Sequence, residues 1–385
     1  MLSFAAKHKN MTLEVDKKET KHVFKTSIVQ QTAFWSEVKQ QQGFKTIAFD
    51  FKIHNTALYS SPIDSIDSYT TADILILLQR IDHEHTIAYV PYGPEIEPEE
   101  EHQGKFLEEL SEALRPYLPA KCVMIRYDLA WQSHWATEPE HFDYQGNWNG
   151  PPEKKYQEFR LNFNTQNWNL QKANSDILPS NTIFLNLKKE TSLLLKQMKP
   201  KTRYNINLSA RKGVQVRDAG LDSLPIWYAL YKDTAFRNNI YLNSIEYFRT
   251  VLSARANDST SPADVHLLIA EVDATPLAAM FLVIAGKRGT YLYGASSTSQ
   301  RNYMATYTLQ WKAMQIAKQK GCIEYDFFGV SPSPDPSHPM YGLFKFKSGF
   351  GGELYHRLGC WDYPLQAQQY TLFKVSEMRS QGYHL

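Results

Sequence analysis

YLYGASSTSQRNYMATYTLQWKAMQIAKQKGCIEYDFFGV, residues 291–330, is the stretch that decides the fold, and GLFKFKSGFGG, residues 342–352, follows it after a proline-rich loop. A strand ending in Tyr-Gly-Ala-Ser-Ser leads into a polar turn, and apolar spacing predicts an amphipathic helix over about 305–320. Gly321 ends that helix, and a second strand is expected over 322–328. This order places polar groups at strand ends, where α/β proteins usually bind ligands.

A weaker copy of this pattern lies in the first half of the chain. The strand TIAYVP (residues 86–91) precedes an acidic turn, a helix expected over 103–117 and the strand CVMIRYDL (122–129). Both second strands begin with Cys, contain Tyr-Asp and follow a helix after a short Lys-containing link. Two such units about 200 residues apart favour duplication into two equivalent domains over chance similarity.

The composition is that of a globular protein. The chain has 385 residues, of which 43% are apolar and 21% charged, and this length suits two cores better than one. Apolar runs such as 74–78 and 277–284 are far shorter than the ~20 residues of a membrane span, and the N-terminus lacks the apolar stretch of a signal peptide. Cys122, Cys322 and Cys360 show no metal-binding or redox spacing, so we expect a cytoplasmic protein.

The charge is nearly balanced but unevenly distributed. A net charge of +2 argues against nucleic-acid binding through bulk electrostatics. Residues 188–213, however, hold eight Lys/Arg against one Glu. This segment is either a solvated helix face or an electropositive surface for a phosphate-rich partner. Asp82-His83-Glu84-His85 suggests metal ligands, but its place between two strand patterns favours an exposed hairpin tip.

Further elements complete the expected map. In the first half we expect strands over 46–54 and 72–82, and a surface excursion and linker over the Trp-bearing residues 131–156. The second half should contain strands and helices in alternation, namely strands 182–187, 266–272, 278–284 and 289–293 and helices 191–198, 201–212, 224–237 and 244–256. The lysine-bearing segment at 343–347 is expected to be a strand, and the tail, 353–385, to return to the first domain.

Several of these segments resemble the FemABX (FemX-like) family of peptidoglycan interpeptide-bridge transferases. The resemblance is strongest over 200–216, 291–329 and 342–362. Near the start, Gln31-Thr32-Ala33-Phe34-Trp35 followed by Lys39 resembles the family's Gln-Ser-x-x-Trp…Lys motif, and PYGPEIE (91–97) its Pro-Arg-Gly-Pro segment. The chain shows no sustained heptads, so it is similar to the members without a coiled-coil arm.

The resemblance implies an α/β (α+β) fold of two tandem acetyltransferase-like (GNAT) domains. The first would comprise residues 1–175 and 359–385 and bind the precursor. The second, 176–358, would carry the catalytic lysine and face aminoacyl-tRNA. The C-terminal tail would return to the first domain.

The implied reaction transfers an amino acid from aminoacyl-tRNA to the side-chain amine of a peptidoglycan precursor stem peptide. The acceptor would be UDP-MurNAc-pentapeptide or a lipid-linked precursor, and peripheral association with the inner face of the membrane is expected. Because the ester is already activated, aminoacyl-tRNA is a co-substrate and neither cofactor nor metal is needed. The amino acid transferred, the number of residues added and the oligomeric state are left open.

The family motif assigns catalysis to Lys347, whose cation would stabilise the oxyanion, with Phe346 beside it shaping the substrate peptide. On the expected strand, alternation places Lys345 and Lys347 on one face. A lysine on a strand is far more often a solvated surface group, so only the motif distinguishes Lys347. Lys345 serves as the control and should matter less.

The resemblance also assigns substrate-binding residues. Lys39 matches the family's phosphate-contacting lysine, next to the motif residue Trp35. Tyr247 and Tyr293 match tyrosines of the cleft, although core packing is the commoner role for such residues among 23 tyrosines.

Two positions depart from the family pattern. Asn243 stands where relatives have a second phosphate-contacting arginine, so either Arg237 or Arg249 compensates or the diphosphate is held differently. Glu97 falls where relatives carry an aspartate. It is a candidate general base, but it is equally a solvated charge in an acidic loop.

Other protein classes fit the residues less well. A CoA-dependent GNAT N-acyltransferase should have a glycine-rich pyrophosphate loop, and SSTSQRNYM (296–304) has no glycine. A non-catalytic protein that binds tRNA or cell-wall precursors stays an alternative. A nucleophilic hydrolase is disfavoured because no Ser or Cys occurs in a recognisable elbow motif.

Overall fold

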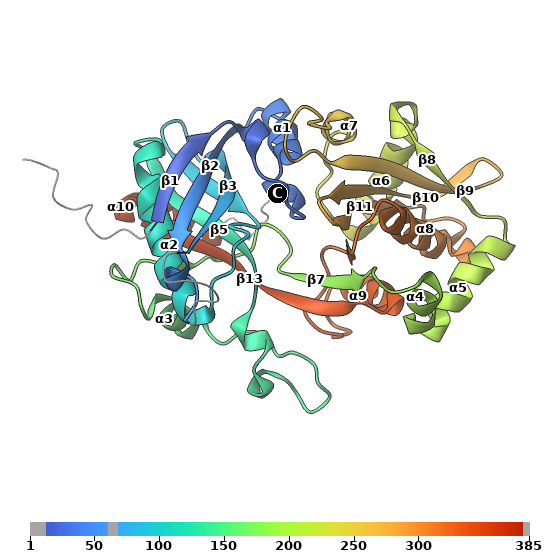
Figure 1. Ribbon diagram of the computed structural model, residues 1–385. Coiled ribbons are helices and arrows are strands. Elements are labelled where there is room, and N and C mark those ends of the chain that lie inside the picture. Colours follow the sequence, from blue (N-terminus) through green and yellow to red (C-terminus); the bar gives the residue numbers. More distant parts are fainter. Residues whose placement is uncertain (1–12, 61–67, 380–385) are drawn as a thin grey trace, which may run out of the picture.

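The structure, a computed structural model, describes residues 13–60 and 68–379. Residues 1–12, on which the signal-peptide expectation mainly rests, and residues 380–385 of the expected tail lie outside this range. Two halves lie side by side, each built on one part of a continuous sheet (Figure 1). Within the described residues the sheet has 13 strands, in the order β1-β2-β3-β4-β5-β13-β7-β12-β11-β10-β9-β8, with β6 paired to β13.

The first half is an antiparallel meander followed by a parallel crossover. Its strands are β1 (Leu13–Lys18), β2 (Lys45–His54), β3 (Tyr69–Arg80), β4 (Thr86–Pro91), β5 (Cys122–Gln132) and the short β6 (Gln171–Lys172). Its helices are α1 (Ala33–Gln41), α2 (Glu100–Leu114) and α3 (Lys154–Asn162). Strands β4 and β5 pair in parallel with α2 between them, and the buried apolar face of α2 packs on the sheet.

The second half repeats this crossover with its own cores. Its strands are β7 (Asn181–Asn186), β8 (Gln215–Ala219), β9 (Asp264–Val272), β10 (Thr275–Ala285), β11 (Arg288–Ser296) and β12 (Glu324–Asp326). Its helices are α4 (Thr191–Gln197), α5 (Pro200–Arg211), α6 (Leu224–Asn238), α7 (Ile245–Ser253), α8 (Ala305–Gln319) and α9 (Tyr341–Lys347). Strands β11 and β12 are parallel with α8 between them, as β4 and β5 are around α2. The expected duplication of a strand–helix–strand unit is therefore confirmed.

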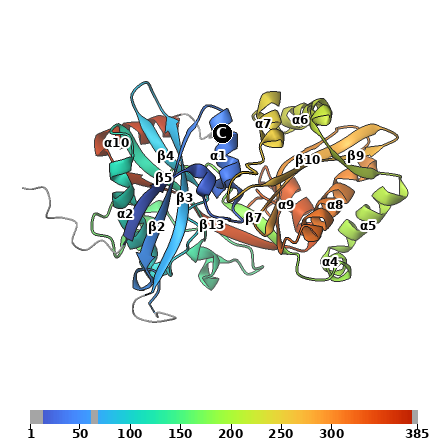
Figure 2. The ribbon, with the colours of Figure 1, turned by 45° about the horizontal axis from the view of Figure 1, so that its top comes forward.

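Helices cover both faces of the second sheet. Side chains of α8, α5 and α4 form one core with the sheet, and α6 and α7 form the other together with α1 from the first half. Figure 2 shows α1 beside α7, where the two halves meet. Residues from both halves are thus available at this junction.

The C-terminal segment joins the halves. Strand β13 (Glu353–Pro364) pairs with β7 through residues 353–356 and with β5 through residues 357–364, and helix α10 (Ala367–Arg379) then packs on the first half. The expected return of the tail to the first half is confirmed. The predicted domain boundary after residue 358 stays a prediction, and it falls within β13, close to where the pairing partner changes.

A buried ionic network fixes this return. Arg126 on β5 donates from Nε to Oδ1 of Asp362 at 2.6 Å and from Nη1 to Oε1 of Glu377 on α10 at 2.6 Å. All three side chains are at most 2% exposed. Two carboxylates therefore share one buried guanidinium, whose loss would leave their charges poorly compensated.

Some expectations about secondary structure are wrong or only partly right. Residues 341–347 form helix α9, not a strand, because a short apolar run fits either structure and the tertiary environment decides between them. The strand expected over 322–328 is reduced to the three residues of β12. The surface excursion expected over 131–156 is confirmed in part: residues 133–153 are irregular apart from short 3-10 turns, and Tyr144 is exposed, but Trp131 lies on β5 and Trp148 is buried. Strands β1 and β8 were not expected. The hairpin tip at Asp82–His85 is confirmed, with Asp82 accepting from the His85 backbone.

We expect Arg126→Ala to lower the free energy of unfolding by about 3–5 kcal/mol, because Asp362 and Glu377 would lose their shared cation while staying buried. Chemical denaturation measures this change. Lys121→Ala is the control, since its pair with Glu84 is exposed on both sides and should contribute less than about 1 kcal/mol. Equal effects of the two substitutions would contradict the role of the buried network.

Candidate functional site

The first part of the site lies where α1 meets α7. Thr32 caps α1 by accepting from the backbone N–H of Trp35 at 3.1 Å. One turn after Trp35, the side chain of Lys39 extends from α1 toward the second half. The Lys39 Nζ lies 5.0 Å from the ring of Trp35 and 5.5 Å from that of Tyr247 on α7. Burial lowers the pKa of the Lys39 ammonium to about 8. This cation is held by aromatic rings and an amide, Gln42, rather than by a carboxylate.

Tyr247 is joined to β11. Its hydroxyl hydrogen-bonds to that of Tyr293, and the two rings meet edge to face at 5.9 Å. Burial raises the pKa of Tyr247 to about 12, so both hydroxyls stay protonated at neutral pH. Lys39, Trp35, Tyr247 and Tyr293, predicted separately from the sequence, therefore form one cluster.

A β-bulge in β11 gives neighbouring tyrosines opposite directions. Tyr291 pairs with Leu282 and Tyr293 with Phe281, so Leu292 is an extra residue in the ladder. Without the bulge, residues 291 and 293 would share a face. Here Tyr293 packs in the core of α6 and α7, and Tyr291 packs in the core of α8. One strand thus contributes to both parts of the site.

The second part of the site is Lys347, at the last residue of α9. Its side chain is 4% exposed, and Nζ donates to the carbonyl oxygens of Gly329 at 2.8 Å and Phe328 at 3.3 Å. The same Nζ lies 5.1 Å from the ring of Tyr291. An ammonium group has three N–H donors, so one remains for a substrate oxygen. Lys345 is exposed, because on a helix two residues apart do not share a face.

The buried environment of Lys347 disfavours the charged form of its side chain. Burial lowers the pKa of this ammonium to about 7, and the negative charge of Asp326 opposes the shift. Asp326 itself accepts from the Thr182 hydroxyl and from the backbone N–H of Phe328. A site that holds an ammonium in apolar surroundings is suited to stabilise developing negative charge.

Residues of the first half reach the surroundings of Lys347. The ring of Tyr92, which follows β4, lies 6.3 Å from that of Phe328. Arg357 of β13 stacks on Tyr92 at 4.5 Å and lies 3.5 Å from Asp326. Tyr92 and Phe328 both have positive φ values, 48° and 58°, which are unusual for bulky residues and frequent at functional sites.

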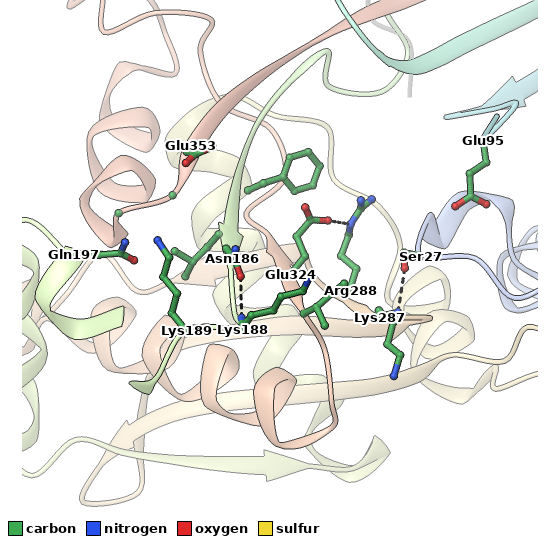
Figure 3. A pocket seen from close by; sticks show the side chains of 15 residues that line it. Ser27, Glu95, Asn186, Lys188, Lys189, Gln197, Lys287, Arg288, Glu324 and Glu353 are labelled. Atoms are coloured by element: carbon green, nitrogen blue, oxygen red, sulfur yellow. Dashed lines mark hydrogen bonds and ion pairs between the residues drawn. The ribbon is translucent and has the colours of Figure 1, made fainter. Parts of the chain in front are cut away.

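Both parts of the site therefore lie toward the carboxyl ends of the parallel strands β11 and β12. A separate cavity of about 530 Å³ lies at their amino ends, where Arg288 pairs with Glu324. Figure 3 shows its charged lining, which comprises Lys188, Lys189, Lys287 and Arg288 with Glu95, Glu324 and Glu353. This cavity is lined by both signs of charge and contains none of the predicted site residues.

The described residues carry neither a metal-binding cluster nor a membrane-spanning helix. Within residues 13–60 and 68–379, no three His, Cys, Asp or Glu side chains are grouped as a metal site would require. None of the helices in this same part of the chain combines the length and the apolar character needed to cross a bilayer.

Comparison with known proteins decides the family. The model of the FemAB family matches residues 12–273 and 263–377, nearly the whole chain. The chain belongs to the FemAB family.

Curated FemAB relatives are similar over parts of their length. The chain is 39% identical over 98 residues to a protein of Staphylococcus saprophyticus named lipid II:glycine glycyltransferase, covering 26% of this chain and 24% of that protein. It is 22% identical over 264 residues to a Staphylococcus epidermidis protein of the same name, covering 53% of this chain and 62% of the relative. The chain thus spans less than two thirds of these relatives.

Among solved structures, the crystal structure of FemX is similar over nearly the whole fold. The TM-score is 0.68 at 18% identity, and the match covers 93% of this chain and 100% of FemX. This similarity confirms the FemX-like α/β fold expected for a FemAB protein.

The other residues predicted for the site are Phe346, Asn243 and Glu97. Phe346 packs against Tyr307 of α8, with the ring centroids 5.0 Å apart, so it faces the core rather than the Lys347 carbonyl pair. Asn243 donates to the Tyr231 hydroxyl at 3.4 Å and lies one turn before Tyr247. Glu97 is exposed and accepts from the backbone N–H of Gln132, and the carboxylate that acts on Lys347 is Asp326. The catalytic and binding roles of all these residues stay predictions.

Of the two arginines expected to compensate for Asn243, one is already paired with a carboxylate and the other can bind an anion. Arg249 pairs with Glu246. Arg237 is held against Ser296 at the end of β11, and within the described residues no carboxylate lies within ion-pair distance of it. Arg237 is therefore the better placed anion-binding group.

Three residues near Lys347 were not predicted from the sequence. Tyr92 was inside the quoted PYGP motif and Tyr291 opened the deciding stretch, but neither was singled out. Arg357 has no local signal, since its contacts with Tyr92 and Asp326 join residues more than 30 positions apart.

We expect Gly294→Ala to destabilise the protein by about 1–3 kcal/mol, the usual cost of overpacking. A Cβ at residue 294 would lie 1.7 Å from the Tyr291 hydroxyl and would displace the ring beside Lys347. Thermal or chemical unfolding measures the effect. Gly220→Ala is the control, because a Cβ there meets nothing within 4 Å. A Gly294→Ala protein as stable as the control variant would show that Tyr291 is not confined as described.

We expect the stability of the wild type relative to Lys347→Met to rise with pH from about 7 to about 10.5. In this window unfolded Lys347 binds a proton and the folded amine does not, so the slope of unfolding free energy with pH is positive, up to ~1.4 kcal/mol per unit. Denaturant unfolding across this pH range measures it. Lys345→Met should give no such slope. A pH-independent difference for Lys347→Met would contradict the lowered pKa.

Proposed function

We propose that this protein is an aminoacyltransferase of peptidoglycan interpeptide-bridge synthesis, which transfers an amino acid from aminoacyl-tRNA to the side-chain amine of a precursor stem peptide. Membership of the FemAB family and relatives named lipid II:glycine glycyltransferase support the reaction class. The observation that carries the proposal is the buried Lys347 Nζ, held by the carbonyls of Phe328 and Gly329 with one N–H left over.

The proposed chemistry needs positioning and charge stabilisation. The acceptor amine attacks the ester carbonyl carbon, a C–N bond forms, and negative charge develops on the carbonyl oxygen. The free N–H of Lys347 stabilises this oxyanion. As the intermediate collapses, the C–O bond to the tRNA ribose breaks, the amine loses a proton, and the ribose oxygen gains one. Aligning the two reactants contributes up to about 7–11 kcal/mol, and one fixed donor adds about 3–4 kcal/mol.

The acceptor would bind across the junction. Lys39 from the first half and Arg237 from the second can contact phosphate groups, and the paired hydroxyls of Tyr247 and Tyr293 lie close to Lys39. The relatives' names favour the lipid-linked precursor over the UDP-linked form as acceptor. The reaction would then take place in the cytoplasm, at the inner face of the membrane.

We expect Lys347→Met to lower the rate of transfer by a factor of about 10²–10³, since it removes one oxyanion donor, while the fold is retained. The assay incubates the protein with a panel of charged tRNAs and with soluble or lipid-linked precursors, and mass spectrometry measures the increment on the stem peptide. Lys345→Met is the matched control and should keep near wild-type turnover.

Two results would refute the proposal. Turnover by Lys347→Met equal to that of the Lys345→Met control would show that Lys347 does not act in the chemical step and would favour a binding protein. Binding of acetyl-CoA in calorimetry, with no transfer from any charged tRNA, would favour a CoA-dependent acyltransferase.

A further inference from the structure

The last turn of α6 and the segment that follows it present an unusual number of apolar side chains to solvent. Phe236 is 93% exposed, Tyr241 58%, Ile240 48% and Leu242 42%. Single exposed apolar residues are normal on protein surfaces, but four within seven consecutive residues form a patch of the kind that marks an interaction site. We call residues 236–242 the apolar lip.

The backbone of the apolar lip is ordered. The Ile240 N–H donates to Ala235 O at 3.1 Å, and Asn239 adopts the left-handed conformation that ends helices. The Tyr231 hydroxyl donates to the carbonyl oxygen of Tyr241 at 3.1 Å. The side chains are therefore presented on a fixed frame, and little conformational entropy of the backbone would be lost on binding.

Positive charge surrounds the lip. Lys232 and Arg301 are exposed, and the pKa of the Arg237 guanidinium is lowered first by burial and then by the nearby charge of Arg301. On the acidic side, the exposed Asp233 acts on the pKa of Arg237 in the opposite direction. Arg249 and Glu246 neutralise each other. Apolar and aromatic side chains flanked by cations are typical of surfaces that enter the interface of an anionic bilayer.

The lip is continuous with the candidate acceptor site. Asn243 directly follows it and bonds to Tyr231, and Tyr247 lies one helical turn further, against Lys39 and Tyr293. Figure 2 shows α7 between α1 and α6. A surface that receives the lip would therefore lie next to the residues expected to bind the precursor phosphates.

We propose that the apolar lip docks on the surface of a membrane containing anionic phospholipid, and that docking presents the acceptor site to precursors embedded in that membrane. The docking stands on the exposed side chains and charges alone; its consequence for the acceptor rests on the proposed function. Ile240 and Leu242 cannot stack on bases, so the lip fits a bilayer better than an RNA strand.

The test is co-sedimentation with vesicles of phosphatidylethanolamine and phosphatidylglycerol, compared with vesicles of phosphatidylcholine alone. We expect the full chain to bind the anionic vesicles and Phe236→Ser/Tyr241→Ser to bind them at least about tenfold more weakly, since two large side chains no longer enter the interface. Leu221→Ser, which changes an exposed side chain just before α6, is the control and should bind like the wild type. Thermal melting checks that all variants are folded.

Transfer assays separate this inference from the proposed function. The double variant should keep wild-type transfer to a soluble precursor and lose transfer to a lipid-linked precursor in vesicles. If the wild type transfers to no acceptor, the proposed function fails, while vesicle binding that depends on the lip still supports docking. Equal vesicle binding by the double variant and the wild type overturns the inference. A second result would also overturn it: analytical ultracentrifugation shows a dimer of the wild type but a monomer of the double variant. A second copy of the chain would then cover the lip.

Discussion

Strand β13 is the constraint on which the arrangement of the two halves depends. Its first residues pair with β7 and its later residues with β5, so one 12-residue strand fixes the relative position of the two parts of the sheet. The buried network of Arg126 with Asp362 and Glu377 anchors the end of β13 and helix α10 to the first half. Because β13 also carries Arg357, the same strand brings a buried cation to Tyr92 and Asp326, next to Lys347.

The candidate site depends on two local departures from regular structure. The bulge at Leu292 turns Tyr291 and Tyr293 to opposite faces of β11, so that one strand serves both the Lys39 cluster and Lys347. The short β12 ends at Asp326, and the carbonyls of Phe328 and Gly329 are then free of the ladder and accept from Lys347. A longer β12 would have used these carbonyls for strand pairing.

Local patterns predicted the elements with strong periodicity. Helix α8 and strand β4 begin at the expected residues, and Gly321, expected to end α8, has the positive φ, 81°, of a residue that ends a helix. Helix α9 was mistaken for a strand because GLFKFK is too short for its period to be distinguished. Strands β1 and β8 escaped notice because they are short and rich in charged residues, and their pairing with β2 and β9 joins residues far apart in the chain.

The sequence by itself determined the duplicated strand–helix–strand unit, the resemblance to the FemABX family and the residues Lys39, Tyr247, Tyr293 and Lys347 as candidates, because these are carried by motifs and by local apolar spacing. Only the tertiary structure decided that Lys347 is buried and Lys345 exposed, that Arg237 rather than Arg249 is clear of a carboxylate among the described residues, and that Tyr92 and Arg357 reach the site. Burial and ion pairing depend on groups far apart in the chain, and no local pattern encodes which of them meet.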